Sequence, residues 1–433
     1  GGAEGGMARV KADRKGDVQA PDVTQPDPKV GPGNQALAGA APLAQQQGGS
    51  AVDLLAGGVV DGADPVSGQT EEPDSFGSLF KDVEAATTPE DRQAAALALT
   101  TWARGNLTNQ ADIQAYLARA DVTADTKTAV LGQLQALLAR NEFLLGTIFH
   151  GGVDQSWETK GANTGPIMDW YMQQSKLAGQ VATKDAAWCT SFVGAQALRA
   201  GFDAGDKAIE RSMFWSGSRL ETWAKTGKAT NGAELNPAGD RPSDSPSGAY
   251  TGGAEWGKLG NSLTAAKDDD GKQAALDTFL ADHEAPQAGD IVVIGEGGNA
   301  YHGKGNSHTL MVESYNPTTG VMSLIEGNSD NRVKGRTLSL RDPADVGKII
   351  HITRLGAENF DDPGNKRTGE GPGAAPERQV TAEQLLNPVR EANAALAALA
   401  VKNKWVKGTD PNASVSELYH GSANAKDEGG TTR

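Results

Sequence analysis

A series of strand and turn signals in residues 286–328 constrains the fold of this 433-residue chain more than any other feature. A turn at 286–290 leads into the continuous apolar run Ile291–Ile294, which is typical of a strand buried on both faces. Residues 308–315 and 321–326 also have strand composition, and the residues between them carry the proline and glycine of a turn. Strands joined by so short a turn pair antiparallel, so the sequence predicts a hairpin in an antiparallel sheet.

The register of this hairpin follows from the turn, because the numbers of residues paired across antiparallel strands have a constant sum and paired residues share a face. The predicted pairs are Tyr315 with Val321, Leu310 with Glu326, and His308 with Asn328. We therefore expect His308 to share one face with Glu326 and Asn328, if the pairing extends that far. A carboxylate or amide beside an imidazole can hold the tautomer and orientation of the ring.

Cys189 is the only cysteine of the chain, and it lies where an aromatic-flanked apolar run begins to have helical character. The first turn of a helix leaves backbone N–H groups unpaired, and their partial positive charge favours a thiolate over a thiol. A buried cysteine that packs as a small hydrophobe is the alternative. A single catalytic cysteine needs a distant histidine, and His308 is the candidate. Taken alone, His308 also fits an ordinary hydrogen-bonded residue at a strand end, and Gly327 with Asn328 fits a turn.

Together, these segments resemble the cysteine, histidine-dependent amidohydrolase/peptidase (CHAP) domains of the papain-like and NlpC-like group. The resemblance covers about residues 151–354 and is carried by Trp188–Val193, 286–292, 307–312 and 325–328. It implies an α+β fold in which a helix bearing the cysteine packs on an antiparallel sheet.

The resemblance also implies roles for individual residues. Cys189 would be the nucleophile, with its backbone N–H in an oxyanion hole. His308 would act first as a general base and later as a general acid, and Glu326 would orient it. Asn328 would polarise the imidazole or shape the pocket.

Three further residues are candidates for contact with substrate. Trp188 would form a wall of the cleft, or alternatively pack in the core. His302 lies in a glycine-rich loop that leads into the His308 strand, and Ser307 directly precedes His308.

The spacing between Cys189 and His308 is longer than in compact domains of this family, which implies an insertion at about 216–285. Turn signals fill this stretch, together with Trp223 and Trp256. Two interpretations remain open: the tryptophans stack on sugar rings, or they pin a surface excursion, and the second is favoured.

The chain divides by composition into four regions. Residues 1–75 are rich in glycine, proline and glutamine and are expected to form a disordered arm. A small α-helical module is expected at 76–148, the CHAP-like domain at 149–356, and a linker with a C-terminal helix and tail at 357–433. The predicted helix starts are a cap at Thr88 followed by proline, caps at Thr108 and Thr123, and a capping box at Thr381, with Pro388 limiting or kinking the last helix.

A net charge of −15 argues against a nucleic-acid partner, since no basic stripe is present. No apolar run is long enough to cross a membrane, and the start of the chain carries no apolar stretch of a secretory signal. No histidine, cysteine or acidic spacing predicts a metal site, and no cofactor is expected.

The leading hypothesis is a cysteine-dependent peptidoglycan hydrolase, either an N-acetylmuramoyl-L-alanine amidase or a peptide endopeptidase, with the substrate supplied by the family resemblance. We expect a bacteriolytic effector that is secreted or delivered to the envelope of a target cell, by an injection apparatus or a virion, with a cognate immunity protein as a candidate partner. The alternatives are a cysteine peptidase or deamidase toxin that acts on proteins, and a non-catalytic structural or binding component of a delivery particle.

Overall fold

The computed structural model describes residues 75–150, 163, 165–174, 188–202, 212–226, 250–295, 307–360, 379–408 and 412–419. The chain separates into two units, Gly1–Thr70 and Glu71–Arg433, and every described residue belongs to the second. The arm predicted at 1–75 therefore lies outside the described residues, apart from its last residue.

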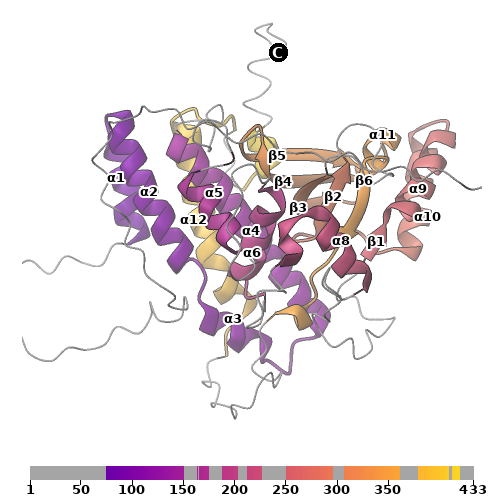
Figure 1. The fold of residues 1–433 in the computed structure, drawn as a ribbon, viewed down its shortest axis with the longest axis horizontal. Coiled ribbons are helices and arrows are strands. Elements are labelled where there is room, and N and C mark those ends of the chain that lie inside the picture. The colour runs from indigo at the N-terminus through magenta and orange to yellow at the C-terminus, as the bar shows by residue number, and fades with distance from the viewer. Residues whose placement is uncertain are drawn as a thin grey trace, which may run out of the picture. The chain divides into compact units, whose positions relative to one another are not determined.

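The described part of the chain has an α+β fold built on one six-stranded sheet (Figure 1). The strands follow the order β1-β6-β2-β3-β4-β5, and each is antiparallel to its neighbours. Their bounds are β1 Tyr250–Gly252, β2 Ile291–Gly295, β3 Ser307–Asn316, β4 Val321–Ser329, β5 Arg332–Ser339 and β6 Ile349–Thr353. The predicted antiparallel sheet is confirmed.

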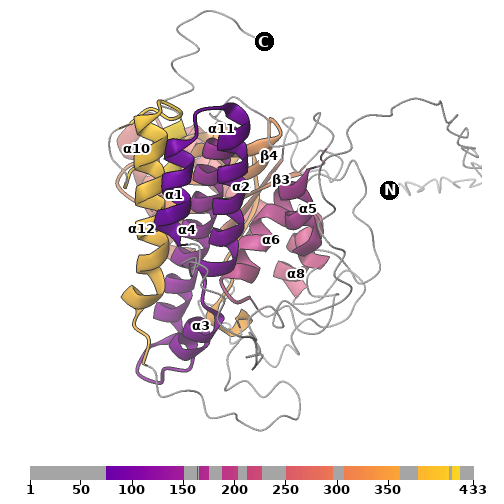
Figure 2. The ribbon, with the colours of Figure 1, turned by 90° about the vertical axis from the view of Figure 1, so that its left-hand side faces the viewer.

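Helices cover both faces of this sheet (Figure 1). One face packs against α4 (Ala124–His150) and α6 (Cys189–Arg199), and α4 in turn lies beside α2 (Pro89–Asn106) and α12 (Ala382–Lys402), as Figure 2 shows. The opposite face packs against α9 (Gly253–Ala265) and α10 (Asp269–Asp282). The remaining elements are α1 Phe76–Ala85, α3 Gln110–Leu117, α5 Pro166–Gln174, η2 Ser212–Trp215, α8 Gly217–Thr226, α11 Pro343–Val346 and η4 Ala357–Asn359.

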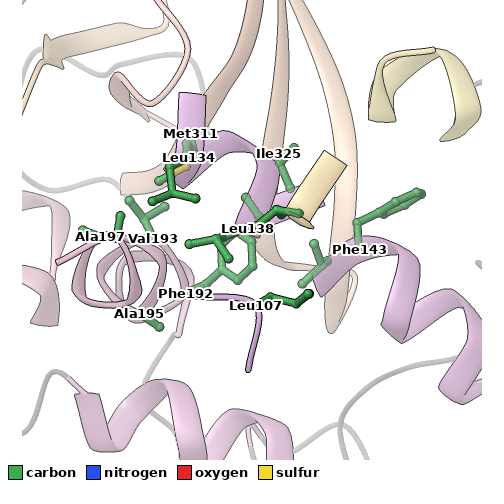
Figure 3. Packing of buried hydrophobic residues seen from close by; sticks show 14 of the residues in the cluster. Leu107, Leu134, Leu138, Phe143, Phe192, Val193, Ala195, Ala197, Met311 and Ile325 are labelled. Atoms are coloured by element: carbon green, nitrogen blue, oxygen red, sulfur yellow. The ribbon is translucent and has the colours of Figure 1, made fainter. Parts of the chain in front are cut away.

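Alternation along the strands explains the two cores. Met311 of β3 and Ile325 of β4 point toward Phe192 of α6 and Leu134 of α4 (Figure 3). Their neighbours Leu310 and Leu324, one residue away, face α9 and α10 instead. Each such buried side chain contributes about 1.5–3 kcal/mol, so the periodicity of two along β3 and β4 fixes which helices meet which face.

The predicted hairpin register is confirmed at one end and wrong at the other. Leu310 pairs with Glu326, as expected. A β-bulge between Val312 and Ser314 adds one residue to β3, so Tyr315 pairs with Met322 rather than with Val321.

Most predicted helix starts are confirmed. The hydroxyl groups of Thr88, Thr123 and Thr381 accept backbone N–H groups three residues ahead, and Thr381 forms the expected capping box. Asn109 caps α3 in place of Thr108. Helix α12 continues through Pro388 as far as Lys402, so this proline does not end it.

The segment predicted as an insertion, 216–285, holds α8, β1, α9 and α10. Trp223 and Trp256 are buried, with exposed fractions of 3% and 1%, so the interpretation that they stack on sugar rings is wrong. Trp256 instead packs against Phe279, with ring centroids 4.9 Å apart, in the core beneath the sheet. Within the described residues, no helix combines the length and apolar character that a membrane crossing requires.

Candidate active site

Cys189 is the first residue of α6, as the sequence predicts. Phe192, Val193, Ala195 and Ala197 anchor this helix in the main core, which holds its start in a fixed place (Figure 3). Gly194 allows the ring of Phe214 to press against the helix, since a Cβ there would lie 2.4 Å from that ring. The position of Cys189 is therefore set by packing along the whole helix.

Trp188, the residue before α6, anchors the start of this helix in the core. Its ring is fully buried and stacks on Tyr171 of α5, with centroids 5.6 Å apart and planes 17° apart. Tyr171 also meets Phe192 edge-on at 5.4 Å. A ring with no exposed surface packs in the core, so Trp188 offers no wall to a substrate.

The thiol of Cys189 lies where β3 and β4 separate. Pairing of these strands ends at Leu310 with Glu326, while β3 continues alone beside β2. The N–H of Val312 donates to Asp290 on the β2 side, so by alternation the N–H of Thr309 points toward β4. With no β4 residue paired there, this N–H donates to the thiol of Cys189 and lowers its pKa.

His308 links the thiol to a carboxylate. Its Nε2 lies 3.1 Å from Oε2 of Glu326, and the ring also interacts with the thiol of Cys189. Both side chains are almost fully buried, at 8% and 2% exposure. The carboxylate thus selects the orientation of the imidazole that a thiol-activating histidine needs.

The charges of this group support one another. Burial alone would lower the pKa of His308, but hydrogen bonds and charge from Cys189 and Glu326 raise it to about 10. Burial likewise opposes the thiolate, but His308 and the Thr309 N–H lower the pKa of Cys189 below its ordinary value. The arrangement favours a thiolate–imidazolium pair, which is the nucleophilic form of a cysteine.

Of the other predicted site residues, the structure describes Asn328 and Ser307. The predicted pairing of His308 with Asn328 does not form, because the pairing of β3 with β4 ends at Leu310 and Glu326. Asn328 lies in a bulge of β4 with a φ of 59°, and among the described residues its side chain has no hydrogen bond. Ser307 is half-buried against α8, close to Gly217. His302 lies outside the described residues.

Two contributors were missed in the sequence. Arg336 of β5 places its Nε 2.8 Å from Oε2 of Glu326, the same oxygen that His308 contacts. Thr190 joins its hydroxyl to that of Thr309 at 2.8 Å and ties the start of α6 to β3. Asp330 and Asn331 form a two-residue turn with positive φ at both positions. Aspartate and asparagine tolerate this backbone conformation, so the pair is a sequence signal that could have indicated a hairpin and hence β5 with Arg336.

A cavity of about 360 Å³ lies elsewhere, between α4, α12 and the segment 412–419. Its lining includes Arg140, Glu313 and Arg390 but neither Cys189 nor His308. Among the described residues, no three histidine, cysteine or acidic side chains gather as a metal site would require. Comparisons of the chain with models of protein families, with curated proteins and with solved structures found no match.

Proposed function

We propose that this chain is a cysteine-dependent amidohydrolase of the CHAP type, in which Cys189, His308 and Glu326 carry the reaction. One observation carries the proposal: a histidine held at 3.1 Å by a buried carboxylate also interacts with the only cysteine, at the start of a helix. The three residues come from α6, β3 and β4, the same kinds of element that the family resemblance implies.

The geometry supports a two-step acyl transfer. His308 holds the proton of Cys189, and the thiolate attacks the carbonyl carbon of an amide. The C–N bond breaks as His308 gives the proton to the leaving amine, which leaves a thioester on Cys189. Water then attacks the thioester, His308 takes its proton, and the acid is released as the thiol re-forms.

Electrostatic support for these steps comes from two directions. The backbone N–H of Cys189, at the positive end of α6, is the candidate donor to the developing oxyanion. Glu326 stays ionised, because His308 and Arg336 lower its pKa although burial alone would raise it. It therefore stabilises the imidazolium without taking up a proton.

The substrate we propose is an amide bond of peptidoglycan, cut as by an N-acetylmuramoyl-L-alanine amidase or a peptide endopeptidase. Its support is the resemblance carried by four segments, three of which contain Cys189, His308 and Glu326. The same resemblance supports a bacteriolytic effector that reaches the envelope of a target cell, with a delivery apparatus and an immunity protein as its partners.

A non-catalytic component of a delivery particle is the second candidate, and one observation favours it: only 4% of the surface of Cys189 is exposed. A thiol so enclosed is also what a purely structural cysteine would show.

Digestion of purified peptidoglycan separates the two candidates. Wild type is compared with Cys189→Ala, and the new termini are identified by mass spectrometry. Fragments released by wild type alone, with either free lactyl groups or cut stem peptides, would support the hydrolase and name the bond. If neither protein releases fragments from several wall chemistries, the proposed wall substrate is wrong. A stoichiometric thiol label, which has one site in this chain, then tells whether Cys189 is reactive toward other acyl groups.

A further inference from the structure

Glu326 has two cationic partners on a single oxygen. Its Oε2 lies 3.1 Å from Nε2 of His308 and 2.8 Å from Nε of Arg336. Glu326 has 2% of its side chain exposed and Arg336 has 30%. Opposite charges attract most strongly where burial limits screening by solvent, so this ion pair holds the buried carboxylate oxygen close to Arg336.

Few other groups face this carboxylate among the described residues. Lys334 pairs with Glu326 across β4 and β5 and is attracted by its charge, but its ammonium forms an ion pair with Asp330. Ser329 adds a hydrogen bond from β4 itself. Cys189 of α6 acts on His308, which in turn contacts Glu326. Arg336 is therefore the strongest cation on Glu326 besides the imidazole.

The backbone that carries Arg336 is itself held in place. The hydroxyl of Ser416, in the segment 412–419, donates to the carbonyl oxygen of Arg336. A Cβ on Gly335 would lie 2.8 Å from the backbone of Ser416, so β5 and the segment 412–419 are in close contact. The N–H of Val415 donates to Glu313 at 2.7 Å, which ties the same segment to β3. Strand β5 is therefore fixed from outside at the residue whose side chain reaches Glu326.

We propose that Arg336 is a positioning residue of the Cys189, His308 and Glu326 site: it fixes Oε2 of Glu326 against His308 and offsets part of the carboxylate's charge. The inference rests on the proposed function for its effect on turnover, but its effect on ionisation does not require turnover. An uncompensated carboxylate would bind the imidazolium more tightly and make His308 a poorer acid for the leaving amine.

The test compares Arg336→Gln with Arg341→Gln as a matched control. Arg341 carries the same charge just beyond β5, but it contacts the carbonyl of Thr318 rather than Glu326. The ultraviolet absorbance of the Cys189 thiolate is titrated in each folded protein, and the pH dependence of kcat/KM is measured. Removal of a nearby cation raises the pKa of every acid around it. We expect both the thiolate titration and the two limbs of the activity profile to move to higher pH in Arg336→Gln alone, with kcat reduced about tenfold to a hundredfold.

Arg336→Lys keeps the charge but not the planar fork of donors. It is expected to retain the wild-type thiolate titration while kcat stays reduced, and it serves as the second variant if Arg336→Gln does not fold. Identical titrations and identical kcat in wild type, Arg336→Gln and Arg341→Gln would overturn the inference, as would full activity in both Arg336 variants. If wild type shows no turnover but the thiolate titration still shifts in Arg336→Gln, the proposed function fails while the electrostatic role of Arg336 stands.

Discussion

At the scale of single residues, contacts around Cys189 lower the pKa of its thiol by more than burial raises it. Burial raises the pKa of the Cys189 thiol, and the net lowering comes from His308, Thr309 and Thr190. His308 is the largest of these contributors. The same thiol without its imidazole would thus be an ordinary buried cysteine.

His308→Ala is therefore expected to reverse the direction of the Cys189 shift. In wild type the thiolate should form below the pH at which an ordinary thiol ionises, and in His308→Ala it should form above it, because only burial and weaker donors remain. Thiolate absorbance during a pH titration measures both, with Cys189→Ala as the blank. Coincident titrations of wild type and His308→Ala would show that the two side chains do not interact.

Glu313, the extra residue of the β3 bulge, gives a second prediction from ionisation. Burial, opposed by Arg140 and the Val415 N–H, raises its pKa from 4.5 to about 6. A raised carboxyl pKa means that the folded protein binds this proton more tightly than the unfolded chain does. Its contribution to stability is therefore present below pH 4.5 and is lost as the pH rises through about 6.

The loss corresponds to about 2 kcal/mol between these limits. Urea unfolding of wild type and Glu313→Gln at several pH values between 4 and 7 measures it. The free energy of unfolding of the variant should lack this component, so the difference between the two proteins should change with pH across that range. A constant difference would contradict the assignment.

At the scale of elements, the bulge in β4 places α6 against the sheet. Gly327 lies in this bulge, and a Cβ there would be 2.7 Å from both Trp188 and Phe192. The Cys189 helix can approach β4 so closely only because residue 327 has no side chain.

Gly327→Ala is expected to push the start of α6 away from β4 and to destabilise the protein by about 1–3 kcal/mol, the usual cost of overpacking. The thiolate titration should also move toward that of an ordinary thiol, since the contact of Cys189 with His308 lengthens. Gly105→Ala is the control, because a Cβ at that position meets nothing within 4 Å. Equal unfolding free energies and equal titrations for the two variants would count against this role of Gly327.

What the sequence could predict differs between these elements. Strand composition and turn spacing locate β2, β3 and β4, and capping residues locate most helix starts, because those signals are local. The bulge at Glu313 has no local signal; it is held by Arg140 and Val415, which are distant in sequence. A resemblance predicted Cys189, His308 and Glu326 as candidates, whereas Arg336 reaches Glu326 through the pairing of β5 with β4, for which the turn at residues 330–331 is the local signal.

At the scale of the whole unit, one of the two cores joins most of the helices to the sheet. Residues of α1 to α4, α6, α12 and β2 to β5 belong to the same hydrophobic cluster. A cluster of charges lies inside it: Glu142 of α4 binds Arg104 of α2 at 2.8 Å and Arg199 of α6 at 3.0 Å, and it accepts the hydroxyl of Tyr171 at 2.9 Å. Because Tyr171 stacks on Trp188, this cluster connects the helical layer to the start of the Cys189 helix.

Glu142→Gln tests how much this cluster of charges contributes to the free energy of unfolding. Burial alone would raise the pKa of Glu142, but the two arginines lower it, so the carboxylate is ionised and fully paired. Loss of its charge leaves two buried guanidinium groups without a counter-ion, which costs about 3–5 kcal/mol. Glu84→Gln is the control, since Glu84 pairs with Lys402 at 2.8 Å at the surface, where such pairs contribute at most about 1 kcal/mol.

Urea unfolding of both variants at neutral pH measures the difference, and circular dichroism confirms that each is folded beforehand. If Glu142→Gln proves as stable as Glu84→Gln, the buried cluster does not hold the layers together. If it is destabilised but its thiolate titration matches wild type, the cluster stabilises the core without positioning the site. A loss of stability with a shifted titration is the expected result, because the start of α6 depends on Trp188 and Tyr171, and Tyr171 depends on Glu142.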